Sequence, residues 1–370
     1  MSASPLRVLQ VAEGAAFAGI ETHVLALAGA IAPDDIHLRA AVFFDAQLVA
    51  SLRDLGVSSR VLRRRSKFDF TPSDEIADAA REVDVIHSHG YLSNIHASRA
   101  ARHAKKPHVI TVHGHREPFS GWNGLKMGAY MALDHRAARR ADRVIAVSNP
   151  IANEMRSFGV TGERLRVVAN GLADRVRDIE TRKRIRAEWE FADADVVVGF
   201  VGRFDPVKAP LRFVEVAAQT CAKTSNVNFV MAGDGPLRAE CERRTAGLGI
   251  GERVRFLGFR TDIDDVIDAF DILLMTSDSE GVPQALLAAM RGGIPAVCSA
   301  VGGIPDILAG MDELTATPHA EALSARLIPL VRDAAMRAEF GAKLRERFER
   351  EYTADVMAAR IAAIYREVVS

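Results

Sequence analysis

Short runs of β-branched and other apolar residues recur along the whole chain, separated by segments with helical spacing. A strand that is a continuous apolar run is buried on both faces, and alternation of such strands with helices is typical of parallel, doubly wound sheets. We therefore predict an α/β fold with two such sheets in series. The predicted strands are residues 8–11, 41–44, 83–86, 109–112, 144–147 and 165–168 in the first half, and 196–201, 227–231, 254–257, 272–276 and 294–298 in the second.

A chain of 370 residues exceeds what one hydrophobic core usually supports, so two domains are expected. We place the boundary after Asn170-Gly171, where the first set of strands ends and a charged segment begins. Residues 1–172 then form the first domain and residues 173–352 the second. Residues 353–370 form a closing amphipathic helix that we expect to pack back on the first domain.

The composition narrows the functional class. The 48 basic residues balance the 48 acidic ones, which argues against a protein held on nucleic acid by bulk charge. Three widely spaced cysteines favour a reducing cytoplasm over a disulfide framework. The N-terminus lacks the pattern of a secretion signal, and no run approaches the ~18–20 apolar residues that span a bilayer. We therefore expect a cytoplasmic protein whose membrane contact, at the inner face of the cytoplasmic membrane, is peripheral.

Two stretches of the second half carry chemistry. Glu280 follows a predicted strand, and Gly281 and Pro283 lead into a helix whose first N–H groups are free to bind an anion. Arg203 and Lys208 follow another predicted strand, where two cations can converge on a pyrophosphate. A capped helix and two solvated surface cations explain the same residues without any ligand.

These stretches resemble, in order and spacing, family 4 of the retaining glycosyltransferases (glycosyl transferases group 1). In the second half the resemblance is carried by Gly202-Arg203 with Lys208, Ala232-Gly233-Asp234-Gly235-Pro236, Phe256-Leu257-Gly258, Glu280-Gly281 with Pro283, and Gly302-Gly303-Ile304-Pro305-Asp306. In the first half it is carried by Ala18-Gly19-Ile20-Glu21, Asp84-Val85-Ile86-His87-Ser88-His89, Thr111-Val112-His113-Gly114, Val147-Ser148 and Asn170-Gly171.

The resemblance implies a GT-B fold, in which two Rossmann-like domains face each other across a cleft. It implies a nucleoside-diphosphate sugar donor held by the second domain and a glycan or lipid-linked glycan acceptor held by the first. By resemblance, Arg203 and Lys208 hold the diphosphate, Glu280 binds the transferred sugar, and His113 lies at the reacting sugar; these four are the expected catalytic residues. Cations aimed at the leaving phosphate can stabilise its charge without a metal.

The resemblance also assigns residues that bind the two substrates. Gly19 would let the backbone close over the phosphate, and the segments near Gly233 and Phe259 would line the base. The expected donor-binding residues are Gly19, Gly202, Gly233, Phe259, Gly281, Val282, Pro283, Gln284, Ala285 and Ala288. The acceptor-side candidates are His89, Tyr91 and His115.

One position departs from the family pattern. The family usually carries a second glutamate eight residues after the first, where it holds the donor ribose, and this chain has Ala288 there. Losing a charged hydrogen bond costs roughly 1.5–3 kcal/mol, or about tenfold to a hundredfold in donor affinity. A non-catalytic binding or partner subunit therefore stays an alternative, as does a nucleotide-sugar epimerase or phosphorylase on the same fold.

No metal and no cofactor are expected. Two acidic strings, Asp193-x-Asp195 and Asp262-x-Asp264, resemble the metal-binding DxD motif of the other glycosyltransferase fold, but the second lies on an acidic, amphipathic helical face. Ten of the 11 histidines lie in the first half. Those at predicted strand ends, His87, His89, His113 and His115, lack the i,i+4 spacing and the carboxylate partner typical of zinc sites.

The segment 116–131 mixes large apolar side chains with cations, and Arg136, Arg139 and Arg140 follow it. Phe119 to Met131 would suit a patch that approaches anionic lipid, while a core-facing helix with a solvated basic end is the alternative. Other enzyme classes fit poorly, because Gly14-x4-Gly19 is not the GxGxxG of a dehydrogenase, and neither a Walker loop nor a GxSxG elbow occurs. The best-supported prediction is a hexosyltransferase-type enzyme of bacterial envelope polysaccharide or glycolipid synthesis.

Overall fold

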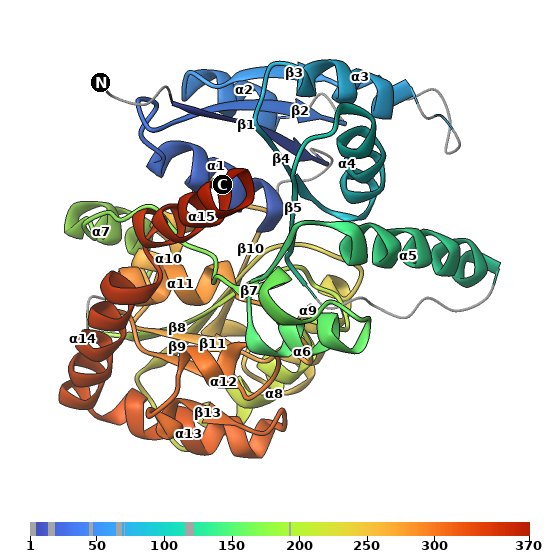
Figure 1. Cartoon of the computed structure of the whole chain (residues 1–370). Helices are drawn as coiled ribbons and strands as arrows, with labels where there is room; N and C mark the ends of the chain where they lie inside the picture. The colour runs from blue at the N-terminus through green and yellow to red at the C-terminus, as the bar shows by residue number, and fades with distance from the viewer. Residues whose placement is uncertain are drawn as a thin grey trace. The chain divides into compact units, whose positions relative to one another are not determined.

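The computed structural model describes residues 5–13, 19–43, 47–63, 69, 71–114, 122–191 and 194–370. The chain forms two compact units, an N-terminal unit of Met1–Ala173 with Glu351–Ser370 and a C-terminal unit of Asp174–Arg350 (Figure 1). In the described ranges, no helix combines the length and the apolar character needed to cross a membrane.

The N-terminal unit contains a seven-stranded parallel sheet with the order β3-β2-β1-β4-β5-β6-β7. Its strands are β1 (Leu6–Ala12), β2 (Ile36–Val42), β3 (Ser58–Val61), β4 (Val85–His89), β5 (His108–Val112), β6 (Arg143–Ala146) and β7 (Leu165–Val167). Its helices are α1 (Gly19–Ala30), α2 (Gln47–Asp54), α3 (Thr71–Ala80), α4 (Tyr91–Ala104), α5 (Trp122–Arg140), α6 (Asn149–Ser157), the short 3₁₀ helix η1 (Gly162–Arg164) and α15 (Ala354–Val369).

Successive residues of the central strands enter two different cores, one on each face of the sheet. Val8 and Val85 belong to the core shared with α1, α2 and α15, whereas Leu9 and Ile86 belong to the core shared with α3 and α4. Burial on both faces explains why these strands are continuous apolar runs in the sequence. Gln10 lies on β1 between these apolar residues and is 2% exposed.

The C-terminal unit contains a six-stranded parallel sheet with the order β10-β9-β8-β11-β12-β13. Its strands are β8 (Val196–Val201), β9 (Val227–Ala232), β10 (Val254–Gly258), β11 (Ile272–Met275), β12 (Ala296–Ser299) and β13 (Thr315–Ala316). Its helices are α7 (Ile179–Glu188), α8 (Pro210–Cys221), α9 (Arg238–Gly247), α10 (Ile263–Asp268), α11 (Gln284–Arg291), α12 (Ile304–Ile307), α13 (Ala320–Arg332) and α14 (Ala334–Glu351), with 3₁₀ helices η2 (Gly251–Arg253) and η3 (Asp312–Leu314).

These two parallel sheets confirm the predicted α/β class and the Rossmann-like architecture of each unit. The predicted strand list was incomplete, because it omitted β3 and β13, and it started β2 too late. β3 is a short edge strand whose residues are exposed or half-buried, so it carries no apolar run. β2 begins at Ile36, before the predicted start. Its first residues alternate between buried and more exposed positions, so they do not form an apolar run in the sequence.

The last helix belongs to the N-terminal unit. Thr353 caps α15 by accepting a hydrogen bond from the Val356 N–H at 3.2 Å. The backbone of Leu172 pairs with the chain on either side of Thr353, through Leu172 N to Tyr352 O at 3.0 Å and Ala354 N to Leu172 O at 2.9 Å. α15 then buries the side chains Met357, Ala358, Ile361, Ala362, Ile364 and Tyr365 in the core that contains α1.

The charged segment after residue 173 is a docked part of the C-terminal unit. Arg186, 2% exposed, pairs with Asp271 at 2.5 Å and donates to the Ala269 carbonyl at 2.9 Å. Arg177 donates to the carbonyls of Asp268 and Phe270 at 2.6–2.8 Å. These arginines satisfy carbonyl groups between α10 and β11, which ties α7 to the sheet.

Candidate active site

In the C-terminal unit, backbone hydrogen bonds link loops that follow five neighbouring strands, β10, β9, β8, β11 and β12. Gly202 N donates to Ala232 O at 3.1 Å, and Gly233 N donates to Gly258 O at 2.8 Å. On the other side, Gly303 N donates to Glu280 O at 3.3 Å. The donor residues predicted in the second half therefore share the carboxyl edge of one sheet, the usual ligand edge of a doubly wound fold.

At this edge Lys208 and Glu280 form a bidentate ion pair. Lys208 Nζ lies 2.7 Å from Glu280 Oε1 and 2.8 Å from Oε2. The Ser277 hydroxyl donates to Oε1 at 2.6 Å, and the Glu280 side chain is 6% exposed. A nearly buried carboxylate with this cation and hydroxyl is held in one orientation at the end of β11.

Arg203 also has an acidic partner. Its Nη2 lies 2.5 Å from Asp205 Oδ2, while its side chain is 77% exposed. Asp205 Oδ1 accepts a hydrogen bond from the Lys208 backbone N–H at 2.9 Å, which fixes the loop between the two cations. Each of the two predicted phosphate-binding cations therefore pairs with a carboxylate of the protein. Arg203 is the more exposed of the two.

The segment before α11 offers backbone donors beside Glu280. Pro283 is the N-cap residue, and its carbonyl accepts from Leu286 N and Leu287 N. The N–H groups of Gln284 and Ala285 precede these first helical bonds and are available to an anion. In the part of the chain that the structure describes, the side-chain oxygen and nitrogen of Gln284 are buried without a hydrogen-bond partner.

Two glycines permit the close packing of these loops. Gly233 has a φ of +136°, and an added Cβ would lie 1.9 Å from the Gly202 carbonyl oxygen. Gly302 has a φ of +56°, and its added Cβ would lie 1.7 Å from the Glu280 carbonyl oxygen. A side chain at either position would displace a neighbouring loop of the site.

The remaining predicted donor residues lie around this edge. Phe259 follows β10 and is 74% exposed, as an aromatic surface for a base would be. Gly281 and Val282 connect Glu280 to α11, and Ala288 lies one turn after Gln284 with 3% exposure. Ala288 therefore presents a methyl group where the family carries its second glutamate.

The described carboxylates of the two acidic strings have side-chain partners within the protein. Asp262 accepts two hydrogen bonds from Arg260 at 2.6 and 2.7 Å, and Asp264 pairs with Arg291 at 2.9 Å. Asp195 accepts from Asn228 at 3.0 Å. Asp193 lies outside the described residues.

In the N-terminal unit, a chain of buried hydrogen bonds joins three strands to α15. Gln10 Nε2 donates to the Tyr365 hydroxyl at 2.9 Å, and this hydroxyl lies 2.6 Å from His87 Nδ1. His87 Nε2 lies 2.7 Å from the Thr111 hydroxyl. Both nitrogens of His87 therefore have partners, and its ring is fixed between β1, β5 and α15.

The same network fixes the protons of His89 and His113. Since Gln10 Oε1 can only accept, His89 Nε2, 2.8 Å away, carries the hydrogen. His89 Nδ1 is then an acceptor for the Nε2–H of His113 at 3.0 Å. His113 Nδ1 is left as a lone pair, and among the described residues it has no partner.

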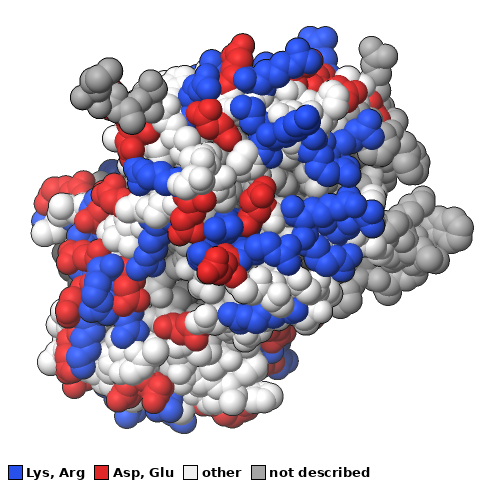
Figure 2. Space-filling model, in the orientation of Figure 1, with Lys and Arg blue, Asp and Glu red and all other residues white. Residues whose placement is uncertain are grey.

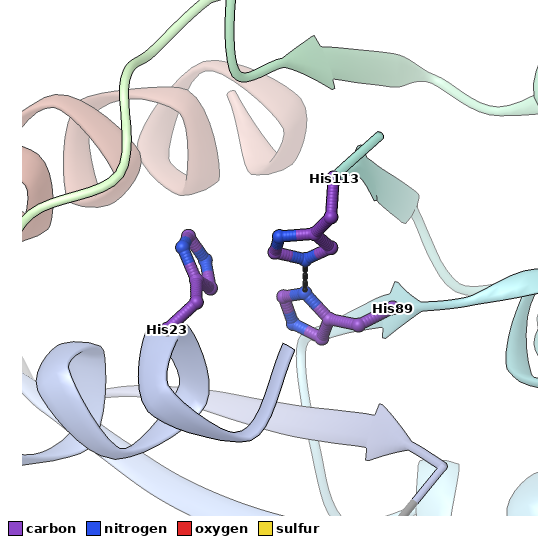
Figure 3. A group of neighbouring side chains, drawn as sticks. All are labelled: His23, His89 and His113. Atoms are coloured by element: carbon purple, nitrogen blue, oxygen red, sulfur yellow. Dashed lines mark hydrogen bonds between the residues drawn. The ribbon is translucent and has the colours of Figure 1, made fainter. Parts of the chain in front are cut away.

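A further histidine, His23 on α1, was not among the sequence candidates. Its Nδ1 lies 2.9 Å from Asn170 Oδ1, and its Nε2 is buried without a partner among the described residues. Figure 3 shows the rings of His23, His89 and His113 turned toward one another from α1, the end of β4 and the residue after β5. No signal in the sequence connects His23 to the other two, because only the fold brings α1 to these strand ends.

One acceptor-side candidate, Tyr91, lines a small cavity of about 100 Å³ together with His113. Its lining includes Tyr91, Asn94 and Asp134, and Asn94 Nδ2 donates to Asp134 Oδ1 at 2.7 Å. An added Cβ at Gly19 would meet no atom of the described residues within 4 Å, so their packing does not require glycine there. His115, Gly14 and Phe119 lie outside the described residues, as do Ala18 and Arg116.

The buried histidines should make the N-terminal unit acid-sensitive. Burial lowers the pKa of His23 to about 4 and that of His108 to about 3, and it lowers the pKa of His87, His89 and His113 well below the usual value of 6.5. The unfolded chain binds these protons more readily, so stability is lost as the pH falls below 6.5.

We expect the free energy of unfolding to fall from pH 6.5 toward pH 4 by roughly 1.4 kcal/mol per pH unit for each histidine that stays neutral. Urea denaturation followed by circular dichroism at pH 7, 6 and 5 measures this slope. His23→Gln should reduce the slope by about the contribution of one histidine. A slope that is flat in wild type would contradict the assignment of neutral buried rings.

Two family models match the chain. The model "Glycosyltransferase Family 4" matches residues 8–175, and the model "Glycosyl transferases group 1" matches residues 181–347. The N-acetyl-alpha-D-glucosaminyl L-malate synthase of Bacillus anthracis is 22% identical over 311 residues, 82% of this chain and 80% of that protein. The UDP-Gal:alpha-D-GlcNAc-diphosphoundecaprenol alpha-1,3-galactosyltransferase of Escherichia coli is 28% identical over 232 residues, 60% of this chain and 59% of that protein.

Solved structures share the fold over nearly the whole chain. HepE of Anabaena, in crystals with UDP, superposes with a TM-score of 0.86 at 20% identity, covering 98% of this chain and 100% of that one. Its complex with UDP-glucose gives a TM-score of 0.84. Because the two family models follow one another along the chain and the fold of both units agrees, the chain belongs to family 4 of the glycosyltransferases, with the GT-B fold.

Proposed function

We propose that the protein is a retaining glycosyltransferase that moves a sugar from a nucleoside-diphosphate sugar to an acceptor hydroxyl, without a metal in the transfer step. The Lys208–Glu280 pair at the edge of the C-terminal sheet carries this proposal. The lysine ammonium can bind phosphate oxygens, and the nearly buried carboxylate beside it can bind sugar hydroxyls. The two parts of a nucleotide sugar could therefore be held at the same point. HepE, with the same fold, is described with UDP and UDP-glucose bound, which supports a nucleotide-sugar donor.

In the proposed mechanism, negative charge builds on the phosphate oxygen as the nucleoside diphosphate leaves. Lys208, Arg203 and the N–H groups of Gln284 and Ala285 stabilise this charge, because they are already oriented before the reaction. Gly202, Gly233, Gly281 and Pro283 shape the loops that carry these groups, and Val282 adds a backbone N–H. Glu280 binds hydroxyls of the transferred sugar.

On the acceptor side, we assign His113, His89 and Tyr91 to the reacting sugar and the acceptor. Neutral His113 has one free lone pair, at Nδ1, which can accept a hydrogen bond from a sugar hydroxyl. The E. coli relative is named for a lipid-linked diphosphoundecaprenol acceptor, which supports a glycan or lipid-linked glycan as the acceptor class and a role in envelope polysaccharide or glycolipid synthesis.

The test is consumption of a nucleoside-diphosphate sugar by wild type and by Glu280→Ala. Release of nucleoside diphosphate by wild type, with retention at the anomeric carbon of the product, is expected, and Glu280→Ala should abolish it. An inactive wild type that still binds nucleotide would favour the non-catalytic partner alternative that Ala288 raises. A product that is an epimerised nucleotide sugar would favour an epimerase.

Ala288→Glu should tighten binding of the nucleoside diphosphate by about tenfold to a hundredfold, because a carboxylate restores a charged hydrogen-bond acceptor for the ribose. The same carboxylate is buried and unpaired without the nucleotide, so the free variant should unfold at a lower temperature. Isothermal titration of wild type and variant measures the affinity. Ala288→Gln is the matched neutral variant. An unchanged dissociation constant in Ala288→Glu would remove the ribose hypothesis.

The basic face of the N-terminal unit supports peripheral contact with an anionic membrane. Arg136, Arg139 and Arg140 are exposed at the end of α5, and Figure 2 shows Lys and Arg gathered on the face that carries α4 and α5. Repulsion from Arg136 and Arg102 lowers the pKa of Arg140, as expected of crowded cations. The side chains of residues 119–127, with the aromatic part of the proposed patch, lie outside the described residues.

Flotation with phosphatidylglycerol vesicles should recover the wild-type protein, and 0.5 M salt should release it. At about 1 kcal/mol for each arginine near the surface, replacing Arg136, Arg139 and Arg140 with glutamine should weaken binding roughly a hundredfold. Arg243→Gln with Arg244→Gln, on α9 of the other unit, is the control. No flotation of wild type would count against membrane contact.

A further inference from the structure

Three buried or half-buried imidazoles from separate elements meet at one point of the N-terminal unit. One ring nitrogen of each of His23, His89 and His113 can be chosen so that all three lie within 4.8 Å of one another. The ring centroids of His23 and His113 are 4.7 Å apart, and those of His23 and His89 are 5.3 Å apart (Figure 3). We refer to these residues as the three-histidine cluster.

Two of the rings are already held in the way that metal-bound histidines are held. A metal-bound histidine usually donates its other N–H to a neighbouring oxygen, which fixes the ring and its tautomer. Asn170 Oδ1 holds Nδ1 of His23, and Gln10 Oε1 holds Nε2 of His89. The remaining nitrogens, His23 Nε2 and His89 Nδ1, face the inside of the cluster.

The three nitrogens, which lie within 4.8 Å of one another, can reach the spacing of a tetrahedral site by rotation of the rings. Two nitrogens bound at ~2.0–2.1 Å to such an ion are ~3.3 Å apart. His89 Nδ1 and His113 Nε2 are 3.0 Å apart, so a small rotation of each ring opens the required space. His23 Nε2 is buried and lacks a partner among the described residues, although a buried polar nitrogen is normally hydrogen-bonded.

From this geometry we propose that the three-histidine cluster binds a divalent transition-metal ion of the Zn²⁺ class. Imidazole nitrogens favour zinc, copper or nickel over magnesium or calcium, which prefer oxygen ligands. Three histidines leave a fourth position for water or another oxygen ligand. Binding requires His113 to move its proton from Nε2 to Nδ1, which has no partner to give up among the described residues. Three neutral rings then bind the ion, and no proton is released.

The cluster differs from the set of histidines considered in the sequence. That set contained His87, whose two nitrogens are occupied by Tyr365 and Thr111, and it lacked His23. The missing i,i+4 spacing does not argue against a site whose ligands come from α1, β4 and the end of β5. The metal is not assigned to the transfer step. Under the proposed function, a metal bound to His113 would keep that side chain from contacting the reacting sugar. Zn²⁺ should therefore inhibit transfer.

The test is a titration of the full-length, chelator-stripped protein with Zn²⁺ against a chromophoric zinc chelator. One Zn²⁺ per chain is expected, and His23→Ala or His89→Ala should weaken binding by roughly a hundredfold, since each removes one ligand. His37→Ala on the exposed surface and His96→Gln, a buried histidine held by Ser73, should bind like wild type. Circular dichroism confirms that each variant is folded.

Zinc-edge X-ray absorption of the wild-type complex needs no variant. It should show three imidazole nitrogens and one oxygen ligand. No stoichiometric binding, a sulfur-containing shell, or full affinity in folded His23→Ala and His89→Ala would overturn the proposal. These measurements do not depend on sugar transfer, so they test the metal site separately from the proposed function. Failure of one proposal therefore does not imply failure of the other.

Discussion

Lys208→Met should lower kcat/KM for sugar transfer by roughly a hundredfold to a thousandfold, the usual cost of removing one preorganised donor from a developing oxyanion. In the structure Lys208 Nζ contacts both oxygens of Glu280. The substitution therefore removes the charge that faces the diphosphate. It also leaves a carboxylate, 6% exposed, whose remaining side-chain partner among the described residues is the Ser277 hydroxyl. Loss of the lysine charge and a Glu280 carboxylate without its cation should both weaken stabilisation of the transition state more than binding of the substrate. We therefore expect kcat to fall more than KM rises.

Lys223→Met is the matched control, because it removes an exposed lysine of the same unit just after α8. Its kcat/KM should equal that of wild type within a factor of two or so, as is usual for surface substitutions far from a site. Steady-state kinetics on wild type, Lys208→Met and Lys223→Met, with the nucleoside diphosphate measured as product, give the three values of kcat/KM. Equal activity of Lys208→Met and wild type would remove Lys208 from the chemistry.

Gly302→Ala should destabilise the C-terminal unit by roughly 2–4 kcal/mol, because it combines a left-handed backbone with a collision. The added Cβ would lie 1.7 Å from the Glu280 carbonyl oxygen, and the hydrogen bond from Gly303 N to that oxygen would be lost. Any relaxation that removes the collision moves Glu280 away from Lys208. Donor affinity should therefore fall even in the fraction that stays folded.

Gly247→Ala provides the comparison for this prediction. Gly247 ends α9, and its added Cβ would meet no atom within 4 Å. Alanine there should be neutral or stabilise the unit by up to about 1 kcal/mol. Urea denaturation gives both free energies, and nucleotide titration gives both affinities. A Gly302→Ala protein with wild-type stability and affinity would show that the loop after β12 does not support Glu280.

The central strands could be predicted because burial on both faces gives them continuous apolar runs. Residues 196–201 form β8 with the predicted bounds, and residues 254–257 fall within β10. The edge strands could not be predicted in the same way. β3 has one solvated side and β13 has two residues, so neither leaves an apolar run in the sequence.

The candidate site likewise contains residues that could be predicted from the sequence and residues that could not. Lys208 and Glu280 are 72 residues apart, but each follows a recognisable strand, and parallel strands bring their carboxyl ends to one edge. Gln10, His23 and Tyr365 carry no such signal. Tyr365 contacts His87 from 278 residues away, because α15 packs beside α1, and only the tertiary structure contains that information.

The proposed function depends most on whether the C-terminal edge holds a nucleoside diphosphate. A thermal-shift panel of UDP, GDP, ADP and CDP, each with its sugar derivatives, tests this directly. One base should stabilise the protein by about 2.7 kcal/mol at a hundredfold excess over its dissociation constant, and Lys208→Met should reduce that shift. No stabilisation by any member of the panel would contradict a nucleotide-sugar-dependent transferase.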